Sequence, residues 1–243
     1  MRVLVNGACG RMGQTLLRLI ENGKLHSSLA AAVDPRGDGQ KILKDYDNAP
    51  QADVIIDFSH HSAIGTLLEY AQAVNLPVVV ATTGHTEEEK QLIRDAAAKI
   101  PVFYSGNMSV GIAVLCALAK KTAAVFPDAD IEIVETHHCH KLDAPSGTAL
   151  MLADAMREAR PTAENHCGRS GMSPRQTNEI GIHAVRRGEI IGIHEVLIST
   201  GTQTITLKHE AHDRALFAEG ALDAAAFLLN KAAGMYNMND MIG

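Results

Sequence analysis

The chain is poor in aromatic residues and contains no tryptophan, so any hydrophobic core has to be built mainly from aliphatic side chains. It also lacks an excess of positive charge: 22 lysines and arginines stand against 28 aspartates and glutamates, for a formal net charge of −6. This balance gives no electrostatic reason to expect binding to nucleic acid. A run of about 18 apolar residues, which a membrane-spanning helix needs, does not occur.

Cysteine is scarce and scattered along the chain. The four cysteines (Cys9, Cys116, Cys139 and Cys167) include no C-x-x-C pair, so the sequence predicts neither a disulfide framework nor a structural zinc knuckle. The chain opens on MRVLVNGACG without a cationic leader and an apolar cleavage region, which favours a cytoplasmic protein. The length allows one large core or two modest cores and does not decide between them.

Short β-branched runs alternate with amphipathic stretches in the N-terminal part of the chain, a pattern that predicts alternating strands and helices. The predicted strands are Val3–Val5, Ala30–Asp34, Val54–Asp57, Val78–Ala81 and Val102–Tyr104, and the helices are Gln14–Glu21, Ser62–Ala73 and one that starts at Thr86–Glu89. Strands that alternate with helices form mostly parallel sheets buried on both faces. We therefore expect an α/β protein with a Rossmann-like, doubly wound dinucleotide-binding domain.

The second half of the chain predicts a different architecture. The expected helices are Ile112–Val125, Gly147 to about Glu158 and Ala215–Lys231, and the expected strands are Ile131–Thr136, Ile180–Val185, Ile190–Ile198 and Thr204–His209. Turns at Arg186–Gly188 and Thr200–Gly201 favour hairpins and a mixed or antiparallel sheet. The segment Pro161–Asn178, rich in Gly, Ser, Pro and Asn, predicts a loop without regular structure.

These patterns predict two domains. Residues 1–106 and 214–243 form the dinucleotide-binding domain, because the closing helix is expected to pack back on it. Residues 107–213 form a second, α+β domain with a mixed sheet.

A glycine-rich turn follows the first predicted strand, in the sequence VLVNGACGRMG. In this arrangement backbone N–H groups and a helix N-terminus can contact a pyrophosphate. The spacing is G-x-x-G-x-x-G, and a glycine triplet alone is weak evidence because turns collect glycine. Two features strengthen it: the turn follows the strand directly, and Asp34 ends the second strand, where a carboxylate can bind both hydroxyls of the adenosine ribose.

Asp34 favours NAD, because its charge repels the 2′-phosphate of NADP. Arg11 and Arg36 are close enough in sequence to pair with that phosphate, so we expect NADH first and leave NADPH open. Another strand ends at Ala81-Thr82-Thr83-Gly84, at the edge where doubly wound sheets bind ligands. Thr82 and Thr83 are therefore expected near the nicotinamide ribose.

Residues 135–149, ETHHCHKLDAPSGTA, combine three histidines and a lysine with the start of a helix. The N–H groups of Gly147 and Thr148 at the helix start and the charge of Lys141 suit a substrate that carries a carboxylate. A histidine can supply a proton near neutral pH to a carbon next to the one that receives hydride. One of His137 and His138 is expected to do so.

Two other interpretations of this segment compete with catalysis. A metal could bind His137-His138-x-His140 with Cys139, but adjacent residues on a strand point to opposite faces and do not share one tetrahedral ion without distortion. We therefore expect no metal. Alternatively the histidines are solvated and Asp143 and Ser146 merely cap the helix, since D-x-P-S-G is also typical of a helix start.

Taken together, the motifs NGACGRMG, DFSHHSA, ATTG, SGNMSVG and above all HHCHKLDAPSGTA resemble the dihydrodipicolinate reductases of bacterial lysine biosynthesis. The resemblance extends through EIGIHAVRRGEIIGIHEV, TITLKHEAHDR and GMYNMNDM and so covers essentially the whole chain. It implies NADH- or NADPH-dependent reduction of 4-hydroxy-tetrahydrodipicolinate, with loss of water, to tetrahydrodipicolinate in the diaminopimelate and lysine pathway. It also implies a homotetramer built through the sheet of the second domain, which binds the dicarboxylate substrate.

The resemblance further implies roles for individual residues. The dinucleotide is expected to be bound by Gly7, Ala8, Cys9, Gly10, Arg11 and Met12 at the pyrophosphate, Asp34 at the adenine ribose, and Ala81, Thr82, Thr83, Ser105, Gly106, Asn107 and Met108 at the nicotinamide half. The substrate side comprises His137 as the proton donor, Lys141 as a second acid or carboxylate clamp, and His138, Gly147 and Thr148 as substrate contacts. Family members often carry an adjacent acid–arginine pair where this chain has Asp34-Pro35-Arg36, so the choice between NADH and NADPH stays open. Cys139 receives no role.

Two other functions are compatible with the first domain. One is another two-domain dehydrogenase, acting on homoserine or an amino acid, and the other is a catalytically silent sensor of NAD(H). The H-H-x-x-K and D-A-P-S-G-T-A motifs favour a dicarboxylate imine over the first alternative. The intact His137 and Lys141 argue against the second.

Overall fold

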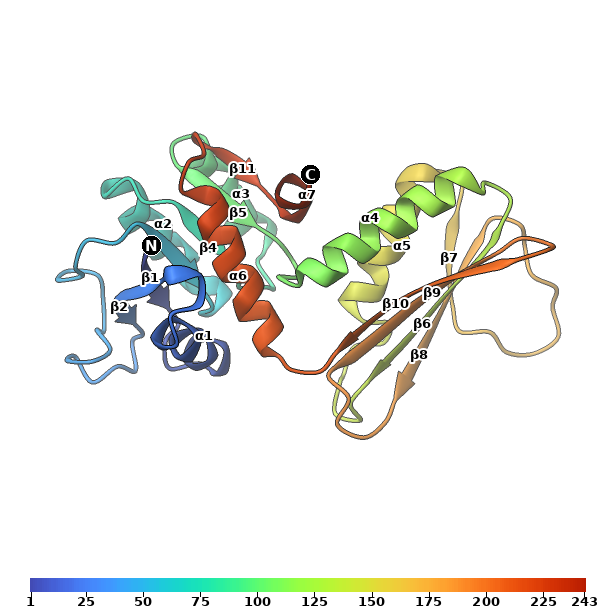
Figure 1. The fold of residues 1–243 in the computed structure, drawn as a ribbon, viewed down its shortest axis with the longest axis horizontal. Coiled ribbons are helices and arrows are strands. Elements are labelled where there is room, and N and C mark those ends of the chain that lie inside the picture. The colour runs from blue at the N-terminus through green and yellow to red at the C-terminus, as the bar shows by residue number, and fades with distance from the viewer. The chain divides into compact units, whose positions relative to one another are not determined.

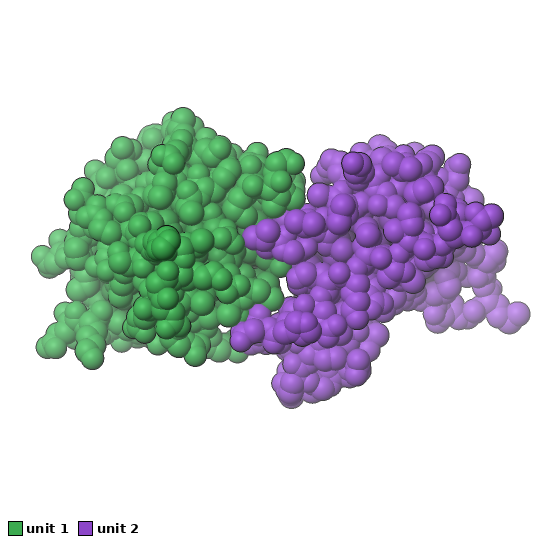
Figure 2. Space-filling view, viewed as in Figure 1, with its two compact units in different colours: residues 1–109, 215–243 green, residues 110–214 purple.

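The computed structural model describes residues 1–243 and divides into two compact units (Figures 1 and 2). Unit 1 comprises Met1–Ser109 and Ala215–Gly243, and unit 2 comprises Val110–Arg214. Each unit has its own hydrophobic core.

Unit 1 is built on a six-stranded sheet in which all neighbouring strands are parallel, in the order β2-β1-β3-β4-β5-β11. The strands are β1 (Arg2–Asn6), β2 (Ser28–Val33), β3 (Val54–Asp57), β4 (Val78–Val80), β5 (Pro101–Tyr104) and β11 (Gly234–Tyr236). The helices are α1 (Arg11–Glu21), α2 (Ile64–Ala73), α3 (Glu87–Ala97), α6 (Ala215–Leu228) and α7 (Met238–Ile242), with short 3-10 turns at Lys24–His26 and His61–Ala63. The predicted parallel, doubly wound α/β sheet is confirmed.

Helices cover both faces of this sheet. On one face α2 and α3 pack together over a cluster that includes Ile55 and Val102. On the other face α6 packs on α1 and lies along β3, β4 and β5 (Figure 1), with Phe227 of α6 edge-on to Phe103. Because both faces are covered, the β-branched runs of β3 and β4 are completely buried, as expected for parallel strands.

The strand order of unit 1 reverses at β1. The chain passes from β1 to β2 on one side of it, and β3 then pairs with β1 on the other side. In doubly wound sheets ligands bind beyond the carboxyl ends of the strands at such a switch point. The loops that follow β1 and β3 therefore flank the expected dinucleotide site.

Unit 2 consists of two helices on one face of a five-stranded mixed sheet with the order β10-β9-β6-β8-β7 (Figure 1). Its strands are β6 (Asp130–His137), β7 (Glu164–Cys167), β8 (Glu179–Arg186), β9 (Gly192–Ser199) and β10 (Thr204–Ala211), and its helices are α4 (Val110–Val125) and α5 (Gly147–Ala159). Strand β6 pairs in parallel with β8 and antiparallel with β9, which confirms the predicted mixed sheet. The longest helix of the chain, α4, has 16 residues, and no helix combines the length and hydrophobicity that a membrane span requires.

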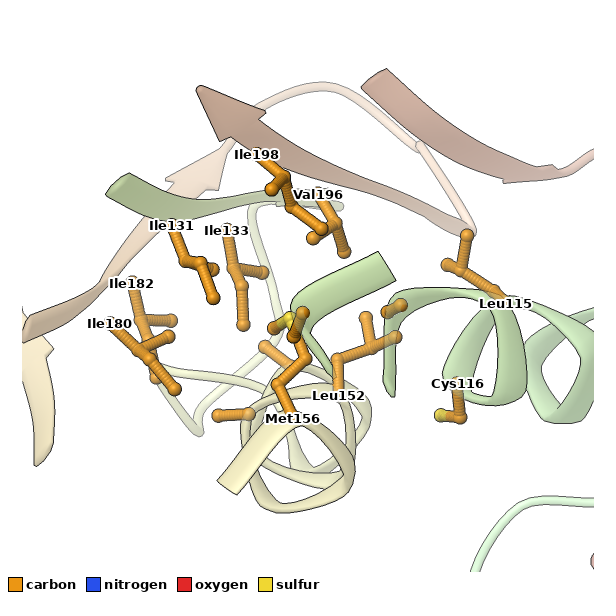
Figure 3. Close-up of a cluster of buried hydrophobic side chains, with 14 of the residues drawn as sticks. Leu115, Cys116, Ile131, Ile133, Leu152, Met156, Ile180, Ile182, Val196 and Ile198 are labelled. Carbon is orange, nitrogen blue, oxygen red and sulfur yellow. The ribbon is translucent and has the colours of Figure 1, made fainter. Parts of the chain in front are cut away.

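Alternate residues of the strands form the core of unit 2 (Figure 3). The side chains that face α5 and α4 are Ile131 and Ile133 on β6, Ile180 and Ile182 on β8, and Val196 and Ile198 on β9, and they lie opposite Leu152 and Met156 of α5 and Leu115 of α4. Because side chains alternate along a strand, the next two residues of β6 on this face are Glu135 and His137. Two ionisable side chains, Glu135 and His137, thus follow Ile131 and Ile133 on the core-facing side of β6.

Some details of the secondary structure differ from the prediction. The segment Pro161–Asn178, predicted to be irregular, contains the edge strand β7, which pairs in parallel with β8. All residues of β7 are exposed, so backbone pairing alone defines this strand and no hydrophobic alternation marks it in the sequence. The closing helix ends at Leu228 rather than Lys231, and the chain then adds β11 and α7, which are too short to show a periodic pattern.

Candidate active site

The glycine turn after β1 has the compact backbone of a phosphate-binding loop. Gly7 has φ +80°, and a Cβ at this position would lie 2.5 Å from the backbone oxygen of Phe58 in the loop after β3. A Cβ on Gly13 would lie 2.2 Å from the backbone oxygen of Gly7, so α1 packs directly on the turn. No side chain caps α1 at Gly10, and its first N–H groups are therefore available to a phosphate.

Asp34 follows β2 directly and is 2% exposed. Its carboxylate accepts a hydrogen bond from the backbone N–H of Cys9 at 3.0 Å and a two-pronged bond from Arg36, with Nε–Oδ1 and Nη2–Oδ2 distances of 3.0 Å. The hydrogen bond from Arg36 lowers the pKa of Asp34 to about 2. The Arg36 side chain is 70% exposed, so a positive group that faces solvent accompanies the acid expected at the adenine ribose.

The other predicted dinucleotide residues follow β4 and β5. The N–H of Ala81 donates to the backbone oxygen of Asp57 at 3.0 Å, which ties the loop after β4 to the end of β3. In the loop after β5, the Ser105 hydroxyl donates to the backbone oxygen of Asn107 at 2.8 Å. Because the carboxyl ends of parallel strands meet at one edge of a sheet, the structure brings these loops and the glycine turn to the same edge.

Solvent exposure divides these nicotinamide-side residues. Ala81, Thr82 and Ser105 are buried, and the Met108 side chain is 3% exposed. Thr83 and Gly106 are exposed at the sheet edge. Thr83 and Gly106 are therefore the members of this group that face solvent in the single chain.

A completely buried acid, Glu135, organises the histidine-rich segment of unit 2. One carboxylate oxygen accepts hydrogen bonds from the backbone N–H of Ser146 at 3.0 Å and from Nη2 of Arg186 at 2.8 Å. The other oxygen accepts from Nη1 of Arg186 at 2.9 Å and is hydrogen-bonded to Nδ1 of His137. Arg186 occupies the β8 position that pairs with His137 on β6, so strand register assembles this group.

His137 has one ring nitrogen bonded and the other free. Its side chain is 9% exposed, and Nε2 makes no hydrogen bond within the protein. A Cβ on Gly192 of β9 would lie 3.1 Å from this nitrogen, so a glycine leaves space beside it. Burial lowers the pKa of His137, and the bond to Glu135 opposes that effect. Because a carboxylate only accepts hydrogen bonds, the bond to Glu135 places the proton of the neutral ring on Nδ1 and leaves Nε2 unprotonated.

Ser146 links the start of α5 to a second buried histidine. Its hydroxyl caps the helix by accepting from the N–H of Ala149 at 3.2 Å, and it lies 3.2 Å from Nε2 of His194 on β9. The His194 ring is 4% exposed and stands edge-on to the His137 ring, with centroids 5.1 Å apart. Nδ1 of His194 is buried without a partner, and burial lowers the pKa of His194 to about 4. His194 is therefore neutral at neutral pH.

The neutral, buried state of His194 predicts a loss of stability in acid. The folded ring resists protonation until about pH 4, whereas the unfolded ring titrates near pH 6.5, so the unfolded state binds more protons between these values. We expect this residue to lower the free energy of unfolding by about 2 kcal/mol between about pH 7.5 and pH 5. Urea unfolding of wild type and His194→Gln at both pH values measures it. An equal loss in the two proteins would contradict the assignment.

The remaining predicted substrate residues lie in the segment from the end of β6 to the first turn of α5. Lys141 pairs with Asp143, with an Nζ–Oδ1 distance of 2.8 Å, and its side chain is 22% exposed. His138 is half-buried, and Gly147 and Thr148 form the first turn of α5 after the Ser146 cap. The structure thus gathers a lysine, two histidines and a helix start around one segment of unit 2.

One group of side chains could hold a metal ion. The donor atoms of Cys139, His140 and Glu189 lie within 4.8 Å of one another, and all three side chains are exposed. This group differs from the one considered in the sequence, because it excludes His137, whose Nδ1 is bonded to Glu135. Exposed groups of this kind are common without an ion.

Glu135, Arg186 and His194 join this site in the structure, although the sequence motifs assign them no role in it. A signal for Glu135 was present, since it follows Ile131 and Ile133 in the row of core-facing residues on β6. Buried carboxylates are nearly always paired, so an acid in this row indicates buried partners.

Comparison with known proteins decides the family. Residues 1–108 match the N-terminal part of dihydrodipicolinate reductase, and residues 111–242 match its C-terminal part. This chain belongs to the dihydrodipicolinate reductase family. The 4-hydroxy-tetrahydrodipicolinate reductase of Caldanaerobacter subterraneus subsp. tengcongensis is 42% identical over 252 residues, which span 100% of this chain and 98% of that protein. The enzyme of Akkermansia muciniphila is 40% identical, over 99% of this chain and 97% of that protein.

Solved structures agree with this assignment. The dipicolinate-bound dihydrodipicolinate reductase from Paenisporosarcina sp. TG-14 is 25% identical, with a TM-score of 0.77 over 98% of each chain. The DAP dehydrogenase of C. glutamicum shares the fold, with a TM-score of 0.57 at 14% identity over 98% of this chain and 92% of that one. The protein is therefore an oxidoreductase of lysine biosynthesis with 4-hydroxy-tetrahydrodipicolinate reductase activity, as the motifs predicted.

Proposed function

We propose that this chain reduces 4-hydroxy-tetrahydrodipicolinate with NADH or NADPH, that unit 1 binds the dinucleotide, and that unit 2 binds the substrate. His137 supplies the proton. The observation that carries this assignment is the buried Glu135–His137 pair with Nε2 of His137 free, in the segment that also holds Lys141 and the start of α5.

The residues of unit 1 fit a dinucleotide. At Gly7 and Gly13 a side chain would collide with neighbouring backbone, which keeps the turn compact, and the N–H groups at the uncapped start of α1 are available to a pyrophosphate. The pyrophosphate is bound by Gly7, Ala8, Cys9, Gly10, Arg11 and Met12, the adenine ribose by Asp34, and the nicotinamide half by Ala81, Thr82, Thr83, Ser105, Gly106, Asn107 and Met108. When bound, the reduced nicotinamide supplies the hydride.

The Asp34–Arg36 pair allows use of both dinucleotides. Asp34 can accept bonds from a free 2′-hydroxyl, and the exposed Arg36 guanidinium offsets its charge and can bind a 2′-phosphate. We therefore expect Arg36→Ala to raise KM for NADPH about tenfold and KM for NADH less than about threefold. Steady-state kinetics with both dinucleotides measure this, with Arg18→Ala, an exposed arginine on α1, as the control. A uniform rise in both KM values would rule out a role in phosphate binding.

The substrate site of unit 2 suits a dicarboxylate. Lys141 carries a positive charge, and the N–H groups of Gly147 and Thr148 lie at a helix start, where a carboxylate is stabilised. Dipicolinate, which the Paenisporosarcina enzyme binds, has two such carboxylates. We assign Lys141 to one carboxylate or to a second acid role, and His138 to a substrate contact.

Protonation is assigned to the free nitrogen of His137. The Nε2–H bond of the charged ring breaks, the proton moves to the substrate carbon next to the one that receives hydride, and the nitrogen keeps the electron pair. The neutral ring remains bonded to Glu135 through Nδ1. A proton from water then restores the charged ring.

A coupled assay tests the proposed function. The preceding enzyme of the pathway makes the substrate in place from pyruvate and aspartate semialdehyde, and absorbance follows oxidation of NADH or NADPH. We expect oxidation only when both precursors are present, with tetrahydrodipicolinate as the product by mass spectrometry. Turnover of homoserine or an amino acid instead, or dinucleotide binding without turnover, would refute the proposal.

We also propose that four copies assemble through the face of the unit 2 sheet opposite its helices. Ile193 and Leu197 lie on this face, paired with Thr136 and Glu132 of β6, and both are only half-buried in the single chain. Apolar side chains that are exposed together on a sheet face can mark an interface with another chain. Analytical ultracentrifugation should give four times the mass of the chain, and a monomer at micromolar concentration would exclude the assembly.

The proposed compartment is the cytoplasm. All four cysteines are free thiols, and Cys139 and Cys167 are exposed. Exposed thiols persist in a reducing compartment.

A further inference from the structure

The reaction assigned above leaves the buried carboxylate of Glu135 without a role of its own. Glu135 is 0% exposed, and a carboxylate at such a place is strongly disfavoured unless charged and polar partners surround it. Four hydrogen bonds meet it: two from Arg186, one from the N–H of Ser146 and one from Nδ1 of His137. The three bonds from Arg186 and Ser146 fix the position of the Glu135 carboxylate, and the fourth joins it to the ring of His137, the proposed proton donor.

The partners keep Glu135 ionised. Burial alone would raise the pKa of its carboxyl group, but the bonds from Arg186, His137 and Ser146 hold that pKa below its usual range. The same Arg186 also donates to the backbone oxygen of Asp143 at 2.6 Å. One guanidinium thus fixes both the acid and the loop that carries Lys141.

Among the charged groups around His137, Glu135 is the negative one that can stabilise a positive charge on the His137 ring. Arg186 of β8 and Lys141 of the following loop are positive, and His194 of β9 is a neutral ring in edge contact. Burial and these two cations lower the pKa of His137, whereas Glu135 raises it. Glu135 is the acid that contacts the ring, so its removal is expected to leave a buried imidazole with no anion to stabilise the charged form.

We propose that Glu135 is a positioning residue for proton transfer: clamped by Arg186 and the N–H of Ser146, it holds the His137 ring with Nδ1 protonated and Nε2 free, and stabilises the charged ring. This inference rests on the proposed role of His137 as the proton donor. Two observations support the inference. Glu135 and His137 lie on the same face of β6, and the pairing of β6 with β8 sets Arg186 opposite His137.

Glu135→Gln tests the inference, because it keeps the size of the side chain and removes its charge. We expect kcat at about pH 7.5 to fall about 10- to 100-fold, with KM for substrate and dinucleotide changed less than about threefold. The proton donor must be charged, so kcat declines as pH rises through the pKa of His137. In Glu135→Gln that decline should start at least about one pH unit lower than in wild type.

The chain provides a matched control on the same strand. Glu132 of β6 lies on the opposite face and pairs with His183 of β8, with an Oε2–Nε2 distance of 2.8 Å. Glu132→Gln removes a similar acid–histidine pair away from His137, and its pH profile of kcat should match that of wild type. A shift of equal size in both variants would overturn the inference, because it would reflect a general change of charge.

A second measurement needs no activity and no Glu135 variant. In the full-length protein, NMR of the histidine rings should show a downfield Nδ1 proton from His137 that His137→Gln loses. A His137 ring protonated on Nε2, with Nδ1 unprotonated, would overturn the positioning role. If instead this proton is found but His137→Ala keeps full activity, the proposed function fails and the pairing with Glu135 is structural, so the two failures are distinguishable.

Discussion

Replacing His137 with alanine is expected to lower kcat about 10²- to 10⁴-fold while the dinucleotide affinity stays within about twofold of wild type. The reason is that His137 belongs to the β6–α5 segment of unit 2, whereas the glycine turn and Asp34 belong to unit 1. Lys141→Ala is expected to lose orders of magnitude in turnover with the same unchanged affinity. Steady-state kinetics give kcat, and quenching of dinucleotide fluorescence gives Kd.

A histidine outside the site provides the control for this experiment. His183 of β8 bonds to Glu132 on the other face of the sheet, so His183→Ala should keep a kcat close to that of wild type. A parallel loss of dinucleotide affinity in His137→Ala would contradict the separation of binding from proton transfer. A wild-type kcat in the same variant would remove His137 from the reaction.

Gly7→Ala is expected to weaken dinucleotide binding about 100-fold or more. The added Cβ would lie 2.5 Å from the backbone oxygen of Phe58, and the residue would keep a φ of +80°, which L side chains rarely adopt. The loops after β1 and β3 must move apart, and the N–H groups proposed to bind the pyrophosphate move with them. Calorimetric titration with NADH measures the loss, and thermal unfolding measures the accompanying destabilisation.

Gly23→Ala separates the collision from the strained backbone. Gly23 also has a positive φ, +70°, but a Cβ there meets nothing within 4 Å. We expect this variant to be destabilised by about 1 kcal/mol and to bind NADH normally. Equal dinucleotide affinities in Gly7→Ala and wild type would show that the turn does not shape the binding site.

The strand and helix pattern of the chain was predictable because each element depends on local periodicity. The β-branched runs of β3 and β4 are buried on both faces, and apolar runs of this kind are typical of parallel sheets. Strand β7 was not predictable, because its exposed residues carry no alternation and only pairing with β8 defines it. Long-range pairing of this kind leaves no local signal.

The candidate site likewise contains residues that local sequence predicts and residues that only long-range strand pairing brings there. His137 and Lys141 lie in one motif-rich segment, and that segment alone predicts them as site residues. The sequence pattern predicts Arg186 in a turn, yet it ends β8 and reaches Glu135, which is 51 residues away in sequence. His194 lies in a strand-forming run and reaches the site only because β9 pairs with β6. Register between distant strands, which one sequence does not reveal, supplies these partners.

Growth of a bacterium that lacks its own reductase tests the central claim most directly. Such a strain requires diaminopimelate, and the wild-type chain is expected to restore growth without it, whereas His137→Ala produced at the same level is not. Failure of the folded wild-type protein to restore growth would contradict the assigned reduction. Equal growth with both proteins would contradict the assignment of His137 as the proton donor and favour a sensor of NAD(H) over an enzyme.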